Sequence, residues 1–331
     1  MTTLMNAARG IRQDPPPVWF MRQAGRSLPE YRKAREGTTM LEACLMPELA
    51  AEITMQPVRR HGVDGAVFFS DIVTPLKLAG IDVHIEPGVG PVFAEPLKTR
   101  ADIRAVTSRG IEDASPITEA VSICARELSV PILGFGGAPF TLAAYLVEGK
   151  PSRDHLAARG LMHSDPQAWD ELMTWCASIT RQFLEIQIDA GASVVQLFDS
   201  WAGSLSRADY HKGVLPYSRQ ALAVSGVPRI HFGTGTGEFL DLMAEPADVL
   251  GVDHRIALSE AARRVPGVPL QGNINPAMLT APWEVLARHI DEVLDEGAAA
   301  PAHIVNLGHG VPPTTDPDVL TRIVAYIKGD R

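Results

Sequence analysis

The sequence predicts a fold of the α/β class: a (β/α)8 TIM barrel in a single domain over residues 1–331. Eight apolar runs of strand length alternate with helical segments along the chain. Strands that alternate with helices build a parallel sheet covered on both faces, and eight strands over this length suit a barrel with insertions. An open, doubly wound sheet is the alternative. Polar residues recur at the carboxyl ends of the runs, where barrel enzymes carry their chemistry, and this favours the barrel.

The strands can be located by residue number. The first run, residues 18–21, follows an N-terminal extension and stops at Arg22, and the second, residues 65–69, is followed by Ser70 and Asp71. The other six are residues 131–135, 193–198, 229–232, 248–252, 268–272 and 303–307. After the second run, residues 82–85 and 91–93 flank a glycine-containing turn, which predicts a hairpin insertion.

Helices are predicted between these strands. Residues 48–60 read as a helix with Pro47 at its first position and a kink at Pro57. Asp165 caps a long helix whose apolar residues keep the three/four spacing of one buried face, and Gly191 ends it. The remaining predicted helices are residues 116–128, 206–224 with an interruption at Pro216, 282–296 and 318–328.

Composition narrows the class of protein. The chain is 46% hydrophobic and its net charge is −9, which argues for a globular protein and against nucleic-acid binding. Cys44, Cys124 and Cys176 are too scattered for a disulfide framework or a zinc spacing, so we expect a reducing, cytoplasmic compartment. The uncharged residues 128–147 contain prolines and glycines, which predicts strand, loop and helix in place of a membrane span.

Two arginines make the first candidate site. Arg22 and Arg26 follow the first strand, and the first 35 residues carry seven Lys/Arg against two Asp/Glu in an otherwise acidic protein. Each guanidinium can bind a carboxylate or phosphate through two hydrogen bonds, so a cationic segment on this background suggests an anionic ligand. The alternative is a pair of ordinary surface arginines.

Other strand ends carry further candidates, among them Ser200, Asp253 and Asn273. Asp71 stands between apolar runs, where a carboxylate is costly to bury unless it is paired or used; the alternative is an aspartate that caps the next turn. His309 lies between two glycines, which let the backbone approach a ligand, although it can equally be a loop histidine without a task.

The glycine-rich segment 233–237 suggests a competing function. A strand, a glycine-rich turn, a short helix and a strand ending at Asp253 imitate a dinucleotide-binding unit. The glycine spacing differs from that fingerprint, so a tight turn at the barrel mouth is the preferred interpretation.

Seven blocks in order along residues 17–312 resemble the motifs of the uroporphyrinogen decarboxylase family. They are PVWFMRQAGRSLPEYR (17–32), FFSDIVTPL (68–76), GFGGAPFTLAAYLVEG (134–149), QLFDSWAG (196–203), FGTGTGE (232–238), LQGN (270–273) and NLGHG (306–310). The resemblance implies a distorted barrel that forms a homodimer. It also implies decarboxylation of the four acetate groups of uroporphyrinogen III to coproporphyrinogen III, in tetrapyrrole and haem biosynthesis, without cofactor or metal.

The resemblance also implies roles for individual residues. The substrate-binding segment falls on Arg22, Gln23, Ala24, Gly25 and Arg26, and the central aspartate is Asp71. The other tetrapyrrole contacts fall on Tyr145, Ser200 and His309, with apolar packing from Phe135 and Phe198. Asp71, Arg22, Tyr145 and His309 are the candidate catalytic residues, and the last three are candidate proton donors.

Two positions depart from the family pattern, and two other functions remain open. Asn275 stands where the family usually has Asp, and His254 stands where an aromatic residue follows Asp253. A related barrel that transfers methyl groups with zinc and a corrinoid needs converging thiolates and imidazoles, but no cysteine lies within two residues of a histidine. A porphyrin carrier without catalysis is the third possibility.

Overall fold

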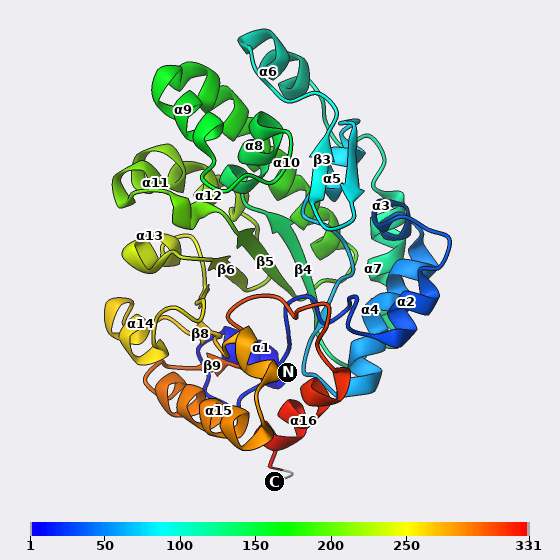
Figure 1. Cartoon of the computed structure of the whole chain (residues 1–331), viewed down its shortest axis with the longest axis vertical. Coiled ribbons are helices and arrows are strands. Elements are labelled where there is room, and N and C mark those ends of the chain that lie inside the picture. The colour runs from blue at the N-terminus through cyan, green and yellow to red at the C-terminus, as the bar shows by residue number, and fades with distance from the viewer. Residues whose placement is uncertain (1, 330–331) are drawn as a thin grey trace.

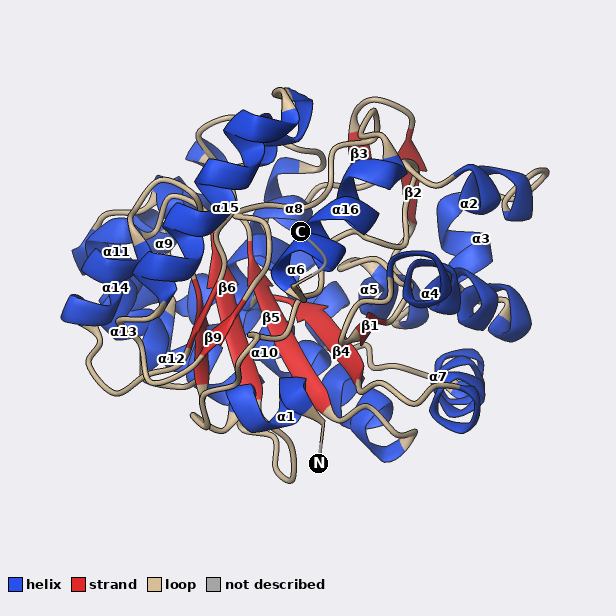
Figure 2. Ribbon diagram, turned by 90° about the horizontal axis from the view of Figure 1, so that it is seen from below, coloured by secondary structure: helices blue, strands red, loops and turns tan. Residues whose placement is uncertain are grey.

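The computed structural model describes residues 2–329 and has the predicted parallel sheet curled into a barrel (Figure 1). Seven strands pair in parallel in the order β1 (Ala66–Val67), β4 (Ile132–Gly137), β5 (Val194–Asp199), β6 (Arg229–Gly233), β7 (Val249–Gly251), β8 (Leu270–Gln271) and β9 (His303–Ile304). Figure 2 shows these strands in the interior with helices around them. The predicted fold class is confirmed.

The first predicted strand completes the ring. Val18 forms a parallel bridge with Val305, just after β9, and its carbonyl oxygen accepts a 2.8 Å hydrogen bond from the backbone N–H of Asp64, just before β1. Residues 17–19 therefore stand between the last strand and β1. These residues pair with their neighbours only around this bridge. The eighth strand of the barrel is therefore shorter than the predicted strand 18–21. Because the sheet closes on itself, the open doubly wound alternative is wrong.

The helices confirm most of the predicted segments. Their bounds are α1 (Thr3–Ala8), α2 (Pro29–Ala34), α3 (Met40–Cys44), α4 (Pro47–His61), α5 (Thr74–Leu78), α6 (Arg100–Thr107), α7 (Ser115–Glu127), α8 (Pro139–Glu148), α9 (Leu156–Ser164), α10 (Pro166–Asp189), α11 (Arg207–Gly213), α12 (Leu215–Ala221), α13 (Leu240–Ala244), α14 (Leu258–Arg264), α15 (Trp283–Gly297) and α16 (Pro317–Ile327). Short 3-10 turns occupy η1 (Ala202–Ser204), η2 (Gly237–Phe239) and η3 (Pro276–Thr280). The predicted helix 206–224 is two helices. It breaks at Val214 because Pro216 is tolerated only in the first turn of a new helix.

The long helix α10 packs closely on β4. The Asp165 side chain caps its first turn by accepting a hydrogen bond from the N–H of Ala168. Gly134 and Gly136 face this helix, and a Cβ atom on either would lie 3.0 Å from Gln187 Oε1 or Thr180 Cγ2. The glycines of the strand therefore let the helix approach the sheet.

The predicted hairpin insertion is also present. β2 (Val83–Glu86) and β3 (Gly90–Phe93) pair in antiparallel fashion. The hairpin is attached to the end of α8, since the N–H of Phe93 donates to the carbonyl of Gly149 at 2.7 Å. The insertion thus lies beside a helix that begins at the carboxyl end of a barrel strand.

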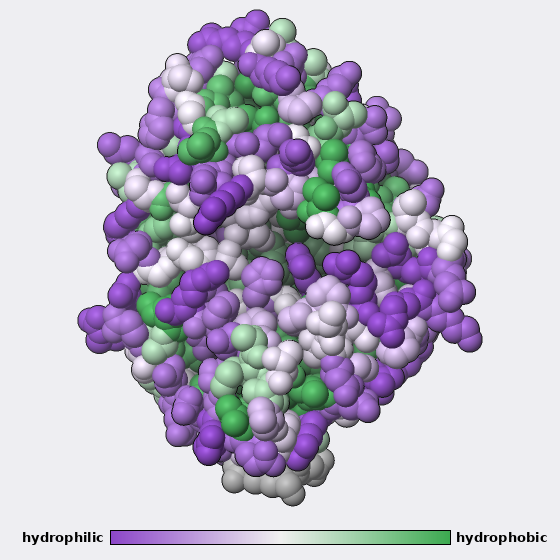
Figure 3. Space-filling model, in the orientation of Figure 1, coloured by the Kyte–Doolittle hydropathy of each residue, from purple (hydrophilic) through white to green (hydrophobic). Residues whose placement is uncertain are grey.

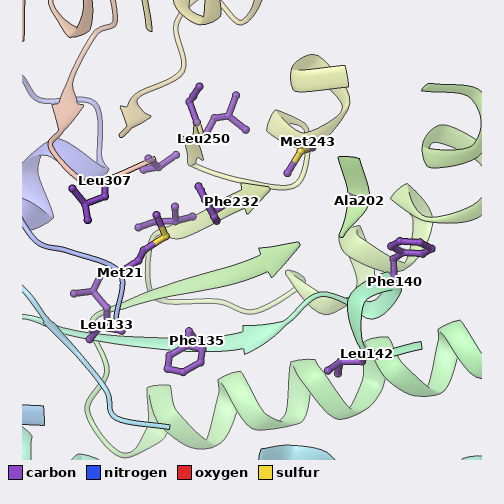
Figure 4. Close-up of a cluster of buried hydrophobic side chains, with 14 of the residues drawn as sticks. Met21, Leu133, Phe135, Phe140, Leu142, Ala202, Phe232, Met243, Leu250 and Leu307 are labelled. Atoms are coloured by element: carbon purple, nitrogen blue, oxygen red, sulfur yellow. The ribbon is translucent and has the colours of Figure 1, made fainter. Parts of the chain in front are cut away.

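The inside of the barrel has an apolar layer and a polar layer. Figure 4 shows Met21, Leu133, Phe232 and Leu307 converging from separate segments of the ring. The polar layer is a buried chain of hydrogen bonds from Trp19 to Gln271 (3.0 Å) and from Gln271 to Gln196 (2.8 Å). Because buried polar groups need partners, this chain fixes the side chains inside the ring.

Within residues 2–329, no helix is both long and apolar enough to cross a membrane.

A buried histidine gives the fold a defined response to acid. Burial lowers the pKa of His303 from 6.5 to about 4, and its Nε2–H donates to the carbonyl of Gly272 at 2.6 Å. Between these two pH values the unfolded chain binds a proton that the folded chain does not. The free energy of unfolding therefore falls as the pH is lowered from about 6.5 towards 4.

We expect this histidine to remove about 2 kcal/mol of stability between pH 7 and pH 5. His303→Gln keeps a donor for the Gly272 carbonyl but does not titrate. Urea unfolding at both pH values should show a shallower loss in the variant, whatever its stability at pH 7. Equal losses in the two proteins would show that His303 does not drive the acid response.

Candidate active site

The Arg22 segment is held in place by two neighbouring strand ends. The N–H of Met21 donates to the Asn306 side chain at 3.0 Å, beyond β9. The Gln23 side chain accepts from the N–H of Phe20 (2.9 Å) and donates to the carbonyl of Gly65 (3.0 Å), before β1. Gln23 is buried and both ends of its amide are occupied by backbone. It therefore shapes the turn that carries Arg22.

Arg22 itself has a left-handed backbone, with φ +63°. This conformation is unfavourable for a long side chain such as arginine, and residues that adopt it are enriched at functional sites. The arginine stem lies on Gly310, because a Cβ atom there would come within 2.5 Å of Arg22 Cδ. The turn and the glycine together hold an exposed arginine side chain within electrostatic reach of His309. Gly310 is thus needed to leave room for the arginine stem.

Arg26 lies farther along the same loop. Its side chain is exposed, its backbone carbonyl accepts a hydrogen bond from Arg32 Nη1, and Ala24 and Gly25 between the two arginines are half-buried. Within residues 2–329, neither Arg22 nor Arg26 forms an ion pair with an acidic side chain. Both guanidinium groups are therefore available to an anion.

Asp71 both caps a turn and faces the site. Its Oδ1 accepts the N–H of Val73 at 3.0 Å, and its own N–H donates to Thr74 Oγ1 at 3.1 Å, at the start of α5. The turn-capping interpretation is therefore correct for one carboxylate oxygen. Burial raises the pKa of Asp71, while the hydrogen bond from Val73 and the nearby Arg22 charge act in the opposite direction. The cap fixes the side chain and leaves the second oxygen for a ligand.

Tyr145 lies on α8, close to both charges. Burial raises the pKa of its hydroxyl, the Asp71 charge raises it further, and the Arg22 charge opposes this. The tyrosine therefore keeps its proton at neutral pH and can donate a hydrogen bond. Arg22, Asp71 and Tyr145 come from three separate segments, and the barrel brings them within electrostatic reach of one another.

His309 occupies the edge of this group. His309 is exposed, but desolvation by the surrounding protein lowers the pKa of its ring, and the charges of Arg22, His254 and Arg255 lower it further. The ring is consequently neutral at physiological pH and can accept a proton as well as donate one. It lies within electrostatic reach of Arg22.

Ser200 and two aromatic rings complete the predicted residues. Ser200 follows β5, and Thr234 Oγ1 donates to its backbone carbonyl, which ties this turn to the turn after β6. The rings of Phe135 on β4 and Phe198 on β5 meet edge to face, with centroids 5.3 Å apart. They form an apolar wall at the carboxyl ends of adjacent strands. In Figure 3 the surface of the molecule is hollowed near its centre, with hydrophobic atoms visible in the hollow.

The other polar strand ends hold the loops together. Asp253 is buried and accepts hydrogen bonds from the backbone N–H groups of Gly235 and Arg255. Asn273 donates to the carbonyls of Asp253 and Ile256. Because the Asp253 carboxylate already occupies a loop N–H of segment 233–237, this segment is a barrel-mouth turn and offers no phosphate cradle. The dinucleotide interpretation is set aside on this ground.

The two departures from the family pattern have different consequences. Asn275 caps η3 by accepting the N–H of Ala277 at 3.0 Å, a task that its amide oxygen performs as well as an aspartate would. His254 is half-buried against Gly308, where a Cβ atom would lie 2.3 Å from the backbone nitrogen of His254. Only glycine fits next to His309 on this side.

Of the three cysteines, Cys44 lies near Asp71 and Thr74, just past the end of β1. Cys44, Cys124 and Cys176 are free and buried, and burial raises the pKa of each thiol. In the described part of the chain, His, Cys, Asp and Glu side chains form no cluster of three or more that could hold a metal.

Two residues near the site were not predicted from the sequence. The Trp201 ring stacks on Tyr145 with centroids 3.9 Å apart, and the His155 ring stacks on Trp201 at 4.3 Å. Trp201 directly follows Ser200, so its position in the motif was a usable signal. Nothing in the sequence around His155 indicates that its ring reaches another loop.

Fold and geometry together define a barrel protein with a candidate site for an anionic ligand at the carboxyl ends of its strands. Comparison with known proteins agrees. The family model for uroporphyrinogen decarboxylase (URO-D) matches residues 1–329. Uroporphyrinogen decarboxylase of Streptomyces coelicolor is 61% identical over 317 residues, covering 94% of this chain and 89% of the relative. That of Arthrobacter sp. is 59% identical over 330 residues, covering 98% and 96%.

This chain therefore belongs to the uroporphyrinogen decarboxylase family. A solved methyltransferase structure from Methanosarcina mazei is similar in fold, with a TM-score of 0.80 over 99% of this chain and 97% of its own. Its sequence identity of 17% extends the likeness to the fold alone.

Proposed function

We propose that this protein is a carboxy-lyase that removes the carboxyl groups of the four acetate side chains of uroporphyrinogen III. The products are coproporphyrinogen III and CO2. Family membership over residues 1–329 supports the reaction. The observation that carries the assignment of the site is Asp71, held by its turn with one oxygen free and close to Arg22 and Tyr145.

The chemistry needs a place for an electron pair. Protonation of a pyrrole ring at an α-carbon makes the ring cationic. The bond from the acetate methylene to its carboxylate then breaks, CO2 leaves, and the electron pair enters the ring. A proton added to the methylene carbon gives the methyl group, and loss of the α-proton restores the pyrrole. The substrate supplies its own electron sink, so no cofactor or metal is required in this proposal.

The protein residues contribute binding and charge. The Asp71 carboxylate accepts hydrogen bonds from pyrrole N–H groups and stabilises the cation that forms on protonation. Arg22 and Arg26 bind the carboxylates of the substrate, with Ala24 and Gly25 presenting backbone between them. Ser200, Phe135 and Phe198 line the macrocycle. Tyr145, Arg22 and His309 are the groups placed to move protons.

A decarboxylation assay tests the reaction directly. We expect anaerobic incubation with uroporphyrinogen III to release CO2 and to give products with seven, six, five and finally four carboxyl groups, in that order of appearance. A chelator should leave the rate unchanged. Tight binding of the substrate without CO2 release would favour a porphyrin carrier. Loss of activity on chelation with recovery on added zinc would favour metal-dependent chemistry.

We also propose that the protein works as a homodimer in the cytoplasm. The sequence motifs shared with the family support both statements, and the scattered, reduced cysteines suit a reducing compartment. A measurement of molecular mass in solution tests the first statement.

A further inference from the structure

The Tyr145 hydroxyl has no hydrogen-bond partner among the described residues, so packing of the ring orients it. Tyr145 is 7% exposed and sits on α8 beneath the hairpin. Its ring meets Phe93 of β3 at 6.0 Å between centroids and Trp201 at 3.9 Å, with the planes tilted by 39° and 38°. Trp201 is the closer contact and therefore the main restraint on the direction of the hydroxyl.

Trp201 is fixed by its own backbone and by a neighbouring turn. Its carbonyl accepts the N–H and the hydroxyl of Ser204, at 3.1 and 2.9 Å. Two residues on, a Cβ atom at Gly203 would lie 2.2 Å from the carbonyl oxygen of Thr234. The turn that carries Trp201 is thus packed against the turn after β6. The backbone of Trp201 cannot move away from Tyr145 unless both turns move.

His155 closes the other side of the indole. Its ring is parallel to that of Trp201 to within 19°, with centroids 4.3 Å apart, and it is buried. The Ser152 hydroxyl bonds to its Nδ1 at 3.1 Å and accepts its backbone N–H at 3.2 Å. The tryptophan is therefore sandwiched between Tyr145 and a histidine that comes from the loop between α8 and α9.

The backbone of His155 gives the stack functional significance. In residues 2–329, the non-glycine residues with positive φ are Arg22 and His155, at +63° and +50°. This conformation is unfavourable for a residue with a side chain, and it persists where the surroundings impose it, commonly at functional sites. One of the two residues is the candidate substrate arginine. The other supports the ring next to the candidate tyrosine.

We propose that Trp201 and His155 are positioning residues that hold the Tyr145 hydroxyl in the direction needed for proton transfer. The inference rests on the proposed function of Tyr145 in the decarboxylation. Trp201 sets the orientation of the tyrosine ring, and His155 acts through Trp201 by filling the opposite face. Both residues contact rings and not the candidate substrate arginines, so we expect them to affect the rate of the bound complex more than its affinity.

The first experiment compares Trp201→Leu with Trp201→Phe and with a control far from the site. Trp283→Leu is the matched control, because Trp283 also meets a tyrosine ring, Tyr326, at 5.5 Å. It lies on α15, at the opposite end of the molecule from α8 and α9 in Figure 1. We expect Trp201→Leu to lower kcat by about tenfold to a hundredfold, the effect of a small misplacement of a reacting group, with KM changed less than about twofold. Trp201→Phe should recover most of kcat.

The second experiment tests whether His155 acts through Trp201. His155→Gly removes the ring, and glycine accepts the positive φ. We expect it to lower kcat, and the double variant with Trp201→Leu should be no slower than Trp201→Leu alone, since both changes release the same ring. Near-ultraviolet circular dichroism of each variant measures loss of the stacked pair independently of catalysis.

The outcomes separate this inference from the proposed function. An inactive wild-type protein would contradict the decarboxylase assignment. An active wild type whose Trp201→Leu variant is as fast as Trp283→Leu would contradict the positioning role and leave the assignment intact. If the losses of kcat in the two single variants multiply in the double variant, His155 does not act through Trp201. Trp201→Leu and Trp283→Leu can also lose the same thermal stability. If only Trp201→Leu then has a lower kcat, the result supports positioning.

Discussion

Asp71→Asn should lower kcat by at least about a hundredfold, the scale of losing one preorganised electrostatic contact. The carboxylate accepts pyrrole N–H groups and stabilises the ring cation, and both tasks need a negative charge. The amide keeps an oxygen that can accept the Val73 N–H, as Asp71 Oδ1 does at 3.0 Å. The substitution therefore removes the charge and keeps the turn. Steady-state kinetics with uroporphyrinogen III measure the effect.

Stability and pH give independent checks on this variant. Burial raises the pKa of Asp71 in the folded protein. At pH values above the ordinary pKa of an aspartate, ionisation of Asp71 therefore lowers the free energy of unfolding. Asp71→Asn should consequently melt no lower than wild type. Wild-type kcat/KM should fall as the pH is lowered through this raised pKa of the free enzyme, because protonation removes the charge, and the variant should lack this step.

A second aspartate provides the matched control. Asp113 accepts the N–H of Ser115 at 2.8 Å in the same turn geometry, but its side chain is exposed. Asp113→Asn should leave kcat unchanged. Asp71→Glu keeps the charge but displaces it, so it should retain more activity than Asp71→Asn. A folded and fully active Asp71→Asn enzyme would disprove the mechanism, and an unfolded one would make Asp71 structural.

Local patterns predicted the parts of the fold that depend on neighbours in sequence. The strand β4 and the helix α10 were correctly located because hydrophobic spacing, a capping aspartate and a proline at the first helical position all act within a few residues. The closure of the ring was implied by the count of strands. The short pairing at Val18, which closes the ring, depends on Asp64 and Val305, and these residues are remote from Val18 in sequence.

The site was predictable in residue type but not in geometry. Asp71 was assigned either to a turn or to a ligand, and the structure shows that one oxygen serves the turn while the other is free for a ligand. Gln23 lies inside the substrate-binding motif, yet its amide is bound to backbone at Phe20 and Gly65. Neither result follows from the sequence, because each depends on which way a side chain turns once the strands have assembled.

The left-handed backbone at Arg22 was likewise invisible to pattern reasoning. Arginine carries no preference for positive φ, unlike glycine or asparagine. The conformation is imposed by contacts on both sides, from Asn306 to Met21 and from Gln23 to Gly65. This backbone determines how the role of Arg22 can be tested.

Arg22→Gly should weaken substrate binding by roughly 1.5–3 kcal/mol, the value of a hydrogen bond to a charged group. Glycine is a better test than alanine at this position, because alanine would be strained at φ +63° and would mix a backbone effect into the result. The loss should shrink for partly decarboxylated substrates, which present fewer carboxylates. Arg26→Ala should weaken binding within the same range without a backbone complication.

Arg22 has a second effect that binding measurements do not report. Its charge opposes the burial that raises the pKa of Asp71, so removing it should raise that pKa further. The acidic fall of kcat/KM should then move to higher pH in Arg22→Gly and stay in place in Arg26→Ala. Arg22→Lys keeps the positive charge but not the bidentate guanidinium, so it should recover the pH profile more fully than the affinity.

The control is Arg181, which pairs with Glu185 on the surface of α10. Arg181→Ala should change neither the substrate affinity nor the pH profile. Wild-type affinity and an unshifted profile in Arg22→Gly would show that Arg22 is an ordinary surface arginine.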